Sequence, residues 1–342
     1  MSRMNWLITG DWHLGVRGDA KVYQDIFKNW VTDFLVPTIK AENVQTLVVL
    51  GDIFDNRNTI NVLTENLGLW AFYYITSECD YLQTYLLVGN HDSYFKNTRE
   101  VHSLKKLQSN NIFIIKDPYS EHWGSRVIDF IPWVVDQEEA DRVFKRKGDI
   151  CLGHFPFTGF EMTKGIVETK GYSLDLLKKN YYKVLSGHFH LRNDVYVGNP
   201  FQMSWADTED QKGVTILNVE TMNMKFIPNT ISPIYKKVYL SQLKNKTVSM
   251  DIFKNNFIKI YLDDKYTDKT LEKLQEVVMS KGPLTFTFEG LSDEDINIDV
   301  AVNDLTNPME SLMTWLGKIE LKKGVERNKL IEKMNSLYTT SI

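Results

Sequence analysis

The sequence predicts an α/β protein with a largely parallel sheet, followed by a small α+β unit and a pair of helices. Short runs of aliphatic and β-branched residues, which are typical of buried strands, alternate with stretches of helical period. Five of these runs end in glycine, and a polar residue follows each glycine. Alternation of strands and helices favours right-handed crossovers, and therefore strands that run parallel to one another.

The first part of the chain supplies three strands and the helices between them. We expect these strands at residues 4–9, 47–50 and 85–88. Apolar residues recur at three- and four-residue spacing over 21–42 and 62–76, which predicts two helices. Pro37 lies inside the first of them, where its missing N–H predicts a kink or an end.

A short helix is expected at 99–109, in a basic stretch. Its surroundings carry four cationic side chains, Lys96, Arg99, Lys105 and Lys106. Either a solvated helix face or a rim that contacts phosphate would account for these charges.

The middle of the chain continues with shorter elements. We expect strands at 112–115, 126–131, 150–153, 184–187, 195–197, 214–219 and 225–227. A charged helix is expected at 137–147. Residues 155–172 have little periodicity and predict a long loop near the functional site, because long loops in compact domains are often functional.

Changes in the pattern divide the chain into three parts. A polar, turn-rich stretch at 229–233 ends a first domain, 1–229. Residues 230–303 alternate strand and helix without a ligand cluster, which predicts a small α+β capping domain. Residues 304–342 carry two apolar stripes of helical spacing, which include Leu312 and Leu316, then Leu330 and Met334. From the pattern alone, this helical pair either docks on its own domain or presents a groove to a partner helix.

Composition excludes few classes of protein. The net charge of -4 does not indicate a nucleic-acid partner, but bound divalent cations and a local basic rim can still attract a phosphate backbone. The two cysteines, Cys79 and Cys151, lie in apolar surroundings, as buried thiols in a reducing compartment do. Neither a signal-peptide pattern nor an apolar run of about 18 residues is present, so we expect a cytoplasmic protein with no membrane partner.

The polar residues after the five glycines form the candidate site. Open α/β sheets bind ligands at the carboxyl ends of their strands, so five such ends side by side would bring these residues to one point. Five of the seven histidines fall in these units. A single Gly–His pair is more often an ordinary turn, but the joint pattern favours a dinuclear metal site. The predicted ligands are Asp11, His13, Asp52, Asn90, His154, His188 and His190.

The ligand types indicate which metals and which chemistry to expect. Imidazole, carboxylate and amide oxygen suit manganese, iron or zinc. We expect Asp11, His13 and His190 around one ion, Asn90, His154 and His188 around the other, and Asp52 as the bridge. Two such ions would clamp a phosphoryl group and acidify a shared water, which indicates phosphoester hydrolysis.

His91 follows a predicted ligand directly and is the candidate catalytic residue, either as the proton donor to the departing oxygen or as a group that stabilises the phosphorane-like charge. Asp92 either orients His91 or caps the turn that follows.

The order of these motifs resembles the calcineurin-like metallophosphoesterase superfamily. All five motifs occur in order between residues 10 and 190. Within that superfamily the chain looks like the DNA double-strand-break repair nucleases of the bacterial SbcD and eukaryotic meiotic-recombination kind, and most like the small subunits of phage recombination endonucleases. The segments that carry the likeness are Gly-Asp-Trp-His-Leu-Gly at 10–15, Gly-Asp-Ile-Phe-Asp at 51–55, Ile-Pro-Trp at 131–133 and Ser-Gly-His-Phe-His at 186–190.

The resemblance implies a four-layer α/β/β/α sandwich, two Mn²⁺ ions, and exonuclease and endonuclease action on DNA in end processing, recombination and repair. It implies a partner, an SbcC-type ABC ATPase subunit with a long coiled coil, bound by the C-terminal helices. It also implies a homodimer formed by helices of the first domain, and the host cytoplasm if the source is a phage. Some members have histidine where this chain has Asp55, so the resemblance carries no role onto Asp55.

Two other functions fit the same motifs, because the motifs specify metals and not a substrate. One is a metallophosphatase that acts on a phosphoprotein, a phosphomonoester or a cyclic nucleotide. The other is a non-catalytic scaffold that binds DNA or the ATPase. The capping domain and helical pair favour the nuclease over the phosphatase, and the complete ligand set argues against the scaffold.

Overall fold

The computed structural model describes residues 5–263 and 266–290. The described part contains two main sheets, a smaller third sheet and a short hairpin. No helix among these residues is long and apolar enough to cross a bilayer. The predicted partner-binding residues Leu312, Leu316, Leu330 and Met334 lie outside the described ranges.

The first sheet has six strands in the order β12-β11-β1-β2-β3-β4. Its parallel strands are β1 (Asn5–Thr9), β2 (Val44–Val49), β3 (Gln83–Leu87) and β4 (Ile112–Ile115). Its antiparallel strands are β11 (Gly213–Asn218) and β12 (Met224–Pro228). The parallel strands confirm the βαβ pattern expected for the first part of the chain.

The second sheet has four strands in the order β10-β7-β6-β5. They are β5 (Tyr119–Trp123), β6 (Arg126–Ile131), β7 (Ile150–His154) and β10 (Lys183–Gly187). Only β5 runs antiparallel to its neighbour. The five strand–glycine units are therefore divided between two sheets, three on the first and two on the second, rather than standing in one row.

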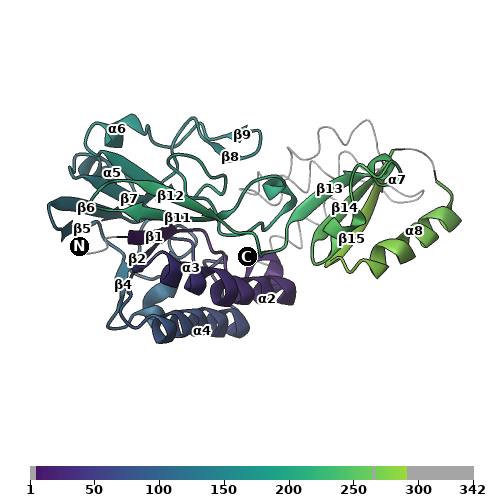
Figure 1. The fold of residues 1–342 in the computed structure, drawn as a ribbon. Helices are drawn as coiled ribbons and strands as arrows, with labels where there is room; N and C mark the ends of the chain where they lie inside the picture. The colour runs from purple at the N-terminus through teal and green to yellow at the C-terminus, as the bar shows by residue number, and fades with distance from the viewer. Residues whose placement is uncertain (1–4, 264–265, 291–342) are drawn as a thin grey trace, which may run out of the picture. The chain divides into compact units, whose positions relative to one another are not determined.

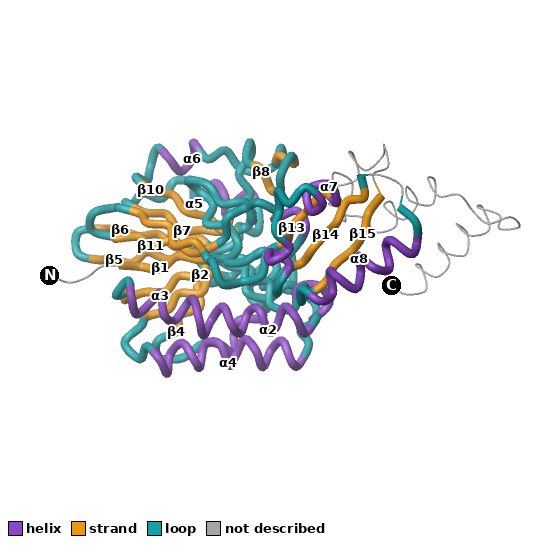
Figure 2. The backbone as a smooth tube through the Cα atoms, turned by 45° about the vertical axis from the view of Figure 1, so that its right-hand side comes forward, coloured by secondary structure: helices purple, strands orange, loops and turns teal. Residues whose placement is uncertain are grey.

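The two sheets pack face to face between two layers of helices (Figures 1 and 2). On one side lie α1 (Val16–Asp19), α2 (Lys21–Asn29), α3 (Val36–Ala41) and α4 (Val62–Glu78); on the other lie α5 (Gln137–Val143) and α6 (Asp175–Lys178). Leu7 packs in the core against the first helices, whereas Trp6 and Ile8 pack in the core between the sheets. Consecutive residues of a strand point to opposite faces of its sheet. Because both faces of these strands are buried, their apolar runs are nearly continuous. The fold is an α/β/β/α sandwich.

Residues 21–42 differ from the single helix expected there. A π-helical turn, Trp30–Leu35, separates α2 from α3, and the Val36 N–H donates to the carbonyl of Val31, five residues back. In an ordinary helix the ring of Pro37 would clash with the carbonyl four residues back. The wider turn directly before Pro37 relieves that crowding, so the proline marks a change of helix type rather than an end.

Three shorter elements also differ from expectation. The helix expected at 99–109 is a 3₁₀ turn, Ser103–Leu107. The strand expected at 195–197 is a single bridge between Ser186 and Tyr196. The loop at 155–172 contains a small hairpin, β8 (Glu161–Thr163) with β9 (Ile166–Val167). Both cysteines are buried and unpaired, as expected.

The third sheet belongs to the later part of the chain and has its own apolar core. It consists of the parallel strands β13 (Tyr235–Tyr239), β14 (Phe257–Leu262) and β15 (Thr285–Gly290), accompanied by α7 (Leu240–Lys244) and α8 (Asp268–Ser280). Its core includes Val238, Ile258, Ile260 and Val278. The division of the chain after residues 229 and 303 stays a prediction.

Arg99 is a buried clamp and not part of a basic rim. Its guanidinium makes two hydrogen bonds of 2.7 Å to the Glu139 carboxylate, and both side chains are under a tenth exposed. It also donates to the carbonyls of Lys116 and Trp133. Burial raises the pKa of Glu139, but the hydrogen bonds from Arg99 outweigh it and hold that pKa below its usual value. Arg99 therefore ties the loop after β3 to α5 and to the loop that carries Trp133.

Replacing Arg99 with methionine should lower the free energy of unfolding by about 3–5 kcal/mol, because it leaves the Glu139 carboxylate buried without its partner. Urea unfolding measures this loss. The matched control is Lys106→Met, which removes an exposed ion pair with Glu65 and should cost about 0–1 kcal/mol. A double variant, Arg99→Met with Glu139→Leu, should recover much of the loss. Equal costs for the two single variants would contradict the clamp.

Candidate metal centre

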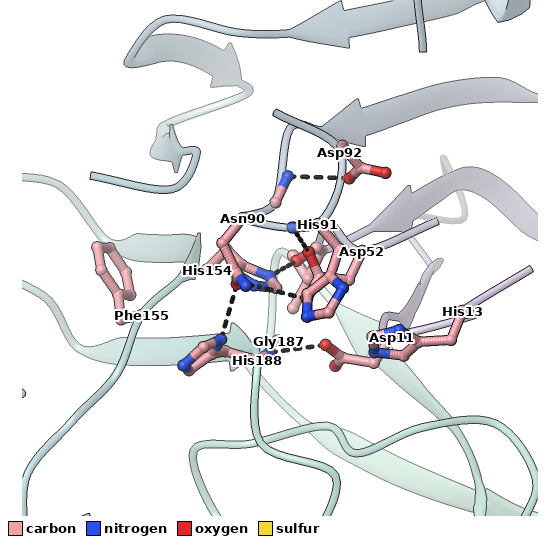
Figure 3. A network of polar contacts seen from close by, with 12 residues as sticks. Asp11, His13, Asp52, Asn90, His91, Asp92, His154, Phe155, Gly187 and His188 are labelled. Atoms are coloured by element: carbon pink, nitrogen blue, oxygen red, sulfur yellow. Dashed lines mark hydrogen bonds and ion pairs between the residues drawn. The ribbon is translucent and has the colours of Figure 1, made fainter. Parts of the chain in front are cut away.

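The predicted ligands come together where the carboxyl ends of β1, β2 and β3 meet those of β7 and β10. Figure 3 labels all of them except His190. Asp11, Asp52 and His154 are almost completely buried. Because the two sheets pack face to face, strand ends from both reach the same place. The loops after β1 and β2 also pair through their backbones: the Asp11 N–H donates to the Gly51 carbonyl and the His13 N–H to the Asp52 carbonyl, both at 3.0 Å.

Four of these residues adopt a backbone conformation with positive φ. The values are 53° for Asp11, 45° for His13, 52° for Asp52 and 96° for His188. Aspartate and histidine tolerate this region better than most residues, but it remains uncommon. Such strain persists only where the surrounding structure holds it, and it clusters at functional sites.

The glycines of the strand–glycine unit mainly provide space. Gly51 does have a positive φ of 96°. Gly89 does not, but a Cβ there would lie 2.1 Å from Asp52 Oδ1. A Cβ on Gly187 would lie 2.5 Å from the Leu50 carbonyl oxygen and 3.2 Å from Asp11 Oδ2. At Gly89 glycine is therefore required because the Asp52 carboxylate occupies the volume of a side chain, and at Gly187 because the Leu50 carbonyl does.

The first cluster contains Asp11, His13 and His190, whose candidate ligand atoms lie within 4.8 Å of one another. His13 Nε2 and His190 Nε2 are 3.1 Å apart, too close for two facing lone pairs unless a proton or a metal ion lies between them. Asp11 Oδ1 accepts from the His188 N–H at 2.9 Å, and Asp11 Oδ2 is buried with no hydrogen-bond partner. This orphaned carboxylate oxygen and the facing imidazoles suit a cation.

The second cluster contains Asp52, His154 and His188, joined by Asn90. His154 Nδ1 donates to the Leu50 carbonyl at 2.6 Å, so Nε2 faces the cluster. That nitrogen lies 2.9 Å from Asn90 Oδ1 and 3.3 Å from Asp52 Oδ2. His188 Nδ1 also lies 2.9 Å from Asn90 Oδ1. Carboxylate, amide oxygen and imidazole converge here, the donor set that borderline-hard divalent metals accept.

Without metal, protons supply the positive charge at both clusters. Burial lowers the pKa of His13, but the hydrogen bond to Asp55 and nearby carboxylates raise it to about 9. Burial likewise lowers the pKa of His154, and Asp52 raises it to about 9. Burial raises the pKa of Asp11 to about 6. Burial and the neighbouring His13 lower the pKa of His190 to about 3, so His190 stays neutral and accepts from His13.

Asp52 lies against the second cluster in the described residues. Its Oδ1 accepts from the His91 N–H at 2.8 Å, and its Oδ2 faces His154. Burial raises the pKa of Asp52, but the charge of His154 brings it well below the usual value, so it is ionised. Only Asp11 serves as carboxylate in the first cluster, and the bridging role of Asp52 stays a prediction.

His91 and Asp92 have separate surroundings. His91 Nδ1 donates to the Asp55 carbonyl at 2.5 Å, and its ring centroid lies 5.0 Å from that of His13. Asp92 accepts from the N–H groups of Gly89, Ile53 and Phe54 at 3.0–3.2 Å. Asp92 therefore caps the backbone of the two loops that carry the site, rather than orienting the His91 ring.

Sequence reasoning assigned no role to three residues that the structure brings to this site. Asp55 Oδ1 lies 3.0 Å from His13 Nδ1. Lys212, buried in an ion pair with Asp207, donates to the His190 carbonyl at 2.8 Å. The ring centroid of Trp133 lies 5.1 Å from that of His188. Asp55 and Trp133 stand in segments that the resemblance singled out, whereas nothing local in the sequence marks Lys212.

Comparison with known proteins finds similarity to a protein family and to a phage protein. The sequence profile of the calcineurin-like phosphoesterase family matches residues 4–192, which hold all five strand–glycine units. The chain is also 27% identical over 346 residues to exonuclease subunit 1 of Enterobacteria phage T4, an alignment that covers 98% of each chain.

The affinity of the metal-free protein for Mn²⁺ should rise with pH up to about 9, because His13 and His154 are protonated below that value. A cation bound at either Nε2 must displace a proton, so each proton adds about one order of magnitude in affinity per pH unit. Calorimetry in buffers of different ionisation enthalpy measures both affinity and proton release. Binding without proton release at neutral pH would contradict this charge arrangement.

Proposed function

The chain belongs to the calcineurin-like phosphoesterase family, and from this premise we propose that it is a metal-dependent DNA nuclease with exonuclease and endonuclease activity. The observation that carries the choice of substrate is the end-to-end similarity to an exonuclease subunit, which extends well beyond residues 4–192. A likeness confined to the phosphoesterase part would favour no substrate over another. DNA end processing, recombination and repair are the processes that such an activity serves.

The proposed cofactors are two divalent metal ions, Mn²⁺ in the first place. Asp11, His13 and His190 would hold one ion; Asn90, His154 and His188 would hold the other; Asp52 would be shared. The orphaned Asp11 Oδ2 and the convergence on Asn90 Oδ1 support this assignment. When bound, such a pair withdraws charge from the phosphate and acidifies the attacking water.

His91 is the proposed proton donor to the departing oxygen. Its Nδ1–H is engaged by the Asp55 carbonyl, so Nε2 is the nitrogen left to exchange a proton with substrate. Its backbone N–H is held by Asp52, which keeps the ring beside the clusters. A histidine so placed can protonate a leaving alkoxide as the phosphodiester bond breaks.

We propose that the chain acts as the nuclease subunit of a complex with an SbcC-type ABC ATPase. The similar phage protein is itself named as a subunit. In this proposal residues 1–229 carry the catalysis, 230–303 cap the DNA groove, and 304–342 bind the ATPase through Leu312, Leu316, Leu330 and Met334. A homodimer of the first domain completes the proposed assembly.

Linear double-stranded DNA should be degraded in the presence of Mn²⁺, and EDTA should stop the reaction. His91→Ala should slow it about 10²- to 10⁴-fold through the loss of the proton donor. The control is His122→Ala, which removes an exposed histidine on β5 and should leave the rate unchanged.

Each failure has a distinct meaning. Cleavage of a phosphomonoester with DNA left intact, even with the ATPase added, would overturn the substrate and leave the metal site standing. Normal DNA degradation by His91→Ala would overturn the role of His91 alone.

A further inference from the structure

Asp55 occupies a position beside the candidate metal centre that its backbone fixes. The Leu14 N–H donates to the Ile53 carbonyl at 2.8 Å, and the Asp55 N–H donates back to the Leu14 carbonyl at 2.9 Å. Leu14 and Phe54 form a parallel bridge. The loop that carries His13 and the loop that carries Asp55 are therefore held in register.

From this position Asp55 contacts two histidines with two different groups. Its carboxylate oxygen Oδ1 lies 3.0 Å from His13 Nδ1. Its backbone carbonyl lies 2.5 Å from His91 Nδ1. Both acceptors require a proton on Nδ1 of the ring they face, because neither oxygen can donate. Each histidine is thereby left with Nε2 as its reactive nitrogen.

For His13 this arrangement selects the nitrogen that a metal needs. Nδ1 donates to Asp55, so Nε2 is directed to His190 and Asp11. A carboxylate that accepts from the remote nitrogen of a ligating histidine holds the ring, fixes its tautomer and raises its basicity. The His13 ring is about one-twentieth exposed, so solvent does not compete for that hydrogen bond while Asp55 is in place.

We infer that Asp55 is a positioning residue: its carboxylate fixes His13 as a ligand through Nε2, while its carbonyl independently fixes His91 as a donor through Nε2. The inference rests on the proposed function, since it concerns the same site. It gives one residue control of both a metal ligand and the proton donor. Removal of such an outer carboxylate weakens metal binding by about 10- to 100-fold.

A competing role for Asp55 is direct ligation. His13, Asp55 and His91 have candidate ligand atoms within 4.8 Å of one another, and the Asp55 carboxylate is 35% exposed. The His13 nitrogen that faces the Asp55 carboxylate is Nδ1, and it already donates to Asp55. Positioning and ligation differ in stoichiometry, because only the loss of a ligand removes a whole ion.

Asp55→Ala and Asp55→Asn separate these roles, with Asp25→Asn as a control on an exposed carboxylate of α2. Mn²⁺ titration of the metal-free proteins should give two ions for every variant, with the dissociation constant raised about 10- to 100-fold by Asp55→Ala. Asp55→Asn keeps an acceptor oxygen, so its increase should be smaller. A lost ion, or unchanged affinity in Asp55→Ala, would overturn the inference.

Nitrogen-15 NMR of the histidine rings tests the same inference without an activity assay, with Zn²⁺ as a diamagnetic probe. In Asp55→Ala the His13 Nδ1–H should lose its protection from exchange, whereas His91 should keep its own because the carbonyl remains. An unchanged His13 signal would overturn the inference. DNA left intact by a wild-type protein that shows the expected His13 signal would count against the proposed function and not against Asp55.

Discussion

The site depends on one constraint: acceptor atoms face one another in a largely buried cluster. His13 Nε2 and His190 Nε2 are 3.1 Å apart, and the neighbouring Asp11 Oδ2 is buried without a partner. Burying such groups unpaired would be costly, so the cluster requires positive charge. Protons on His13 and His154 can supply it, and two divalent ions can supply more.

The surrounding backbone is arranged to tolerate this concentration of ligands. Three features hold the ligand side chains close together. They are the positive φ of Asp11 and Asp52, the close approach of Gly89 to Asp52, and the cap formed by Asp92. The two sheets bury their shared faces in an apolar core directly behind the strand ends. That packed core is rigid and keeps the strained loops in place.

Periodicity is a property of short segments, and it predicted features that depend on short segments. Apolar runs located the strands, and glycine followed by a polar residue located the candidate ligands from Asp11 to His190. These apolar runs do not show whether the strands form one sheet or two. A strand buried on both faces has the same apolar pattern in both arrangements. The four-layer arrangement came from the resemblance.

Contacts between distant segments explain what periodicity missed. The hydrogen bond between Asp55 and His13 spans 42 residues, and the Arg99 clamp reaches Glu139 across 40. The sequence does not show which carboxylate a cationic side chain contacts. From the sequence alone, Arg99 is therefore interpreted as a surface cation. The π-helical turn before Pro37 was missed because proline predicts an interruption but not the form that it takes.

Two ions share the candidate metal centre in the proposed site, and anomalous diffraction from Mn²⁺-soaked crystals tests this most directly. Two peaks about 3.5–4 Å apart are expected, one beside Asp11, His13 and His190, the other beside Asn90, His154 and His188. A single peak, or a peak among His13, Asp55 and His91 in place of these two, would contradict the claim.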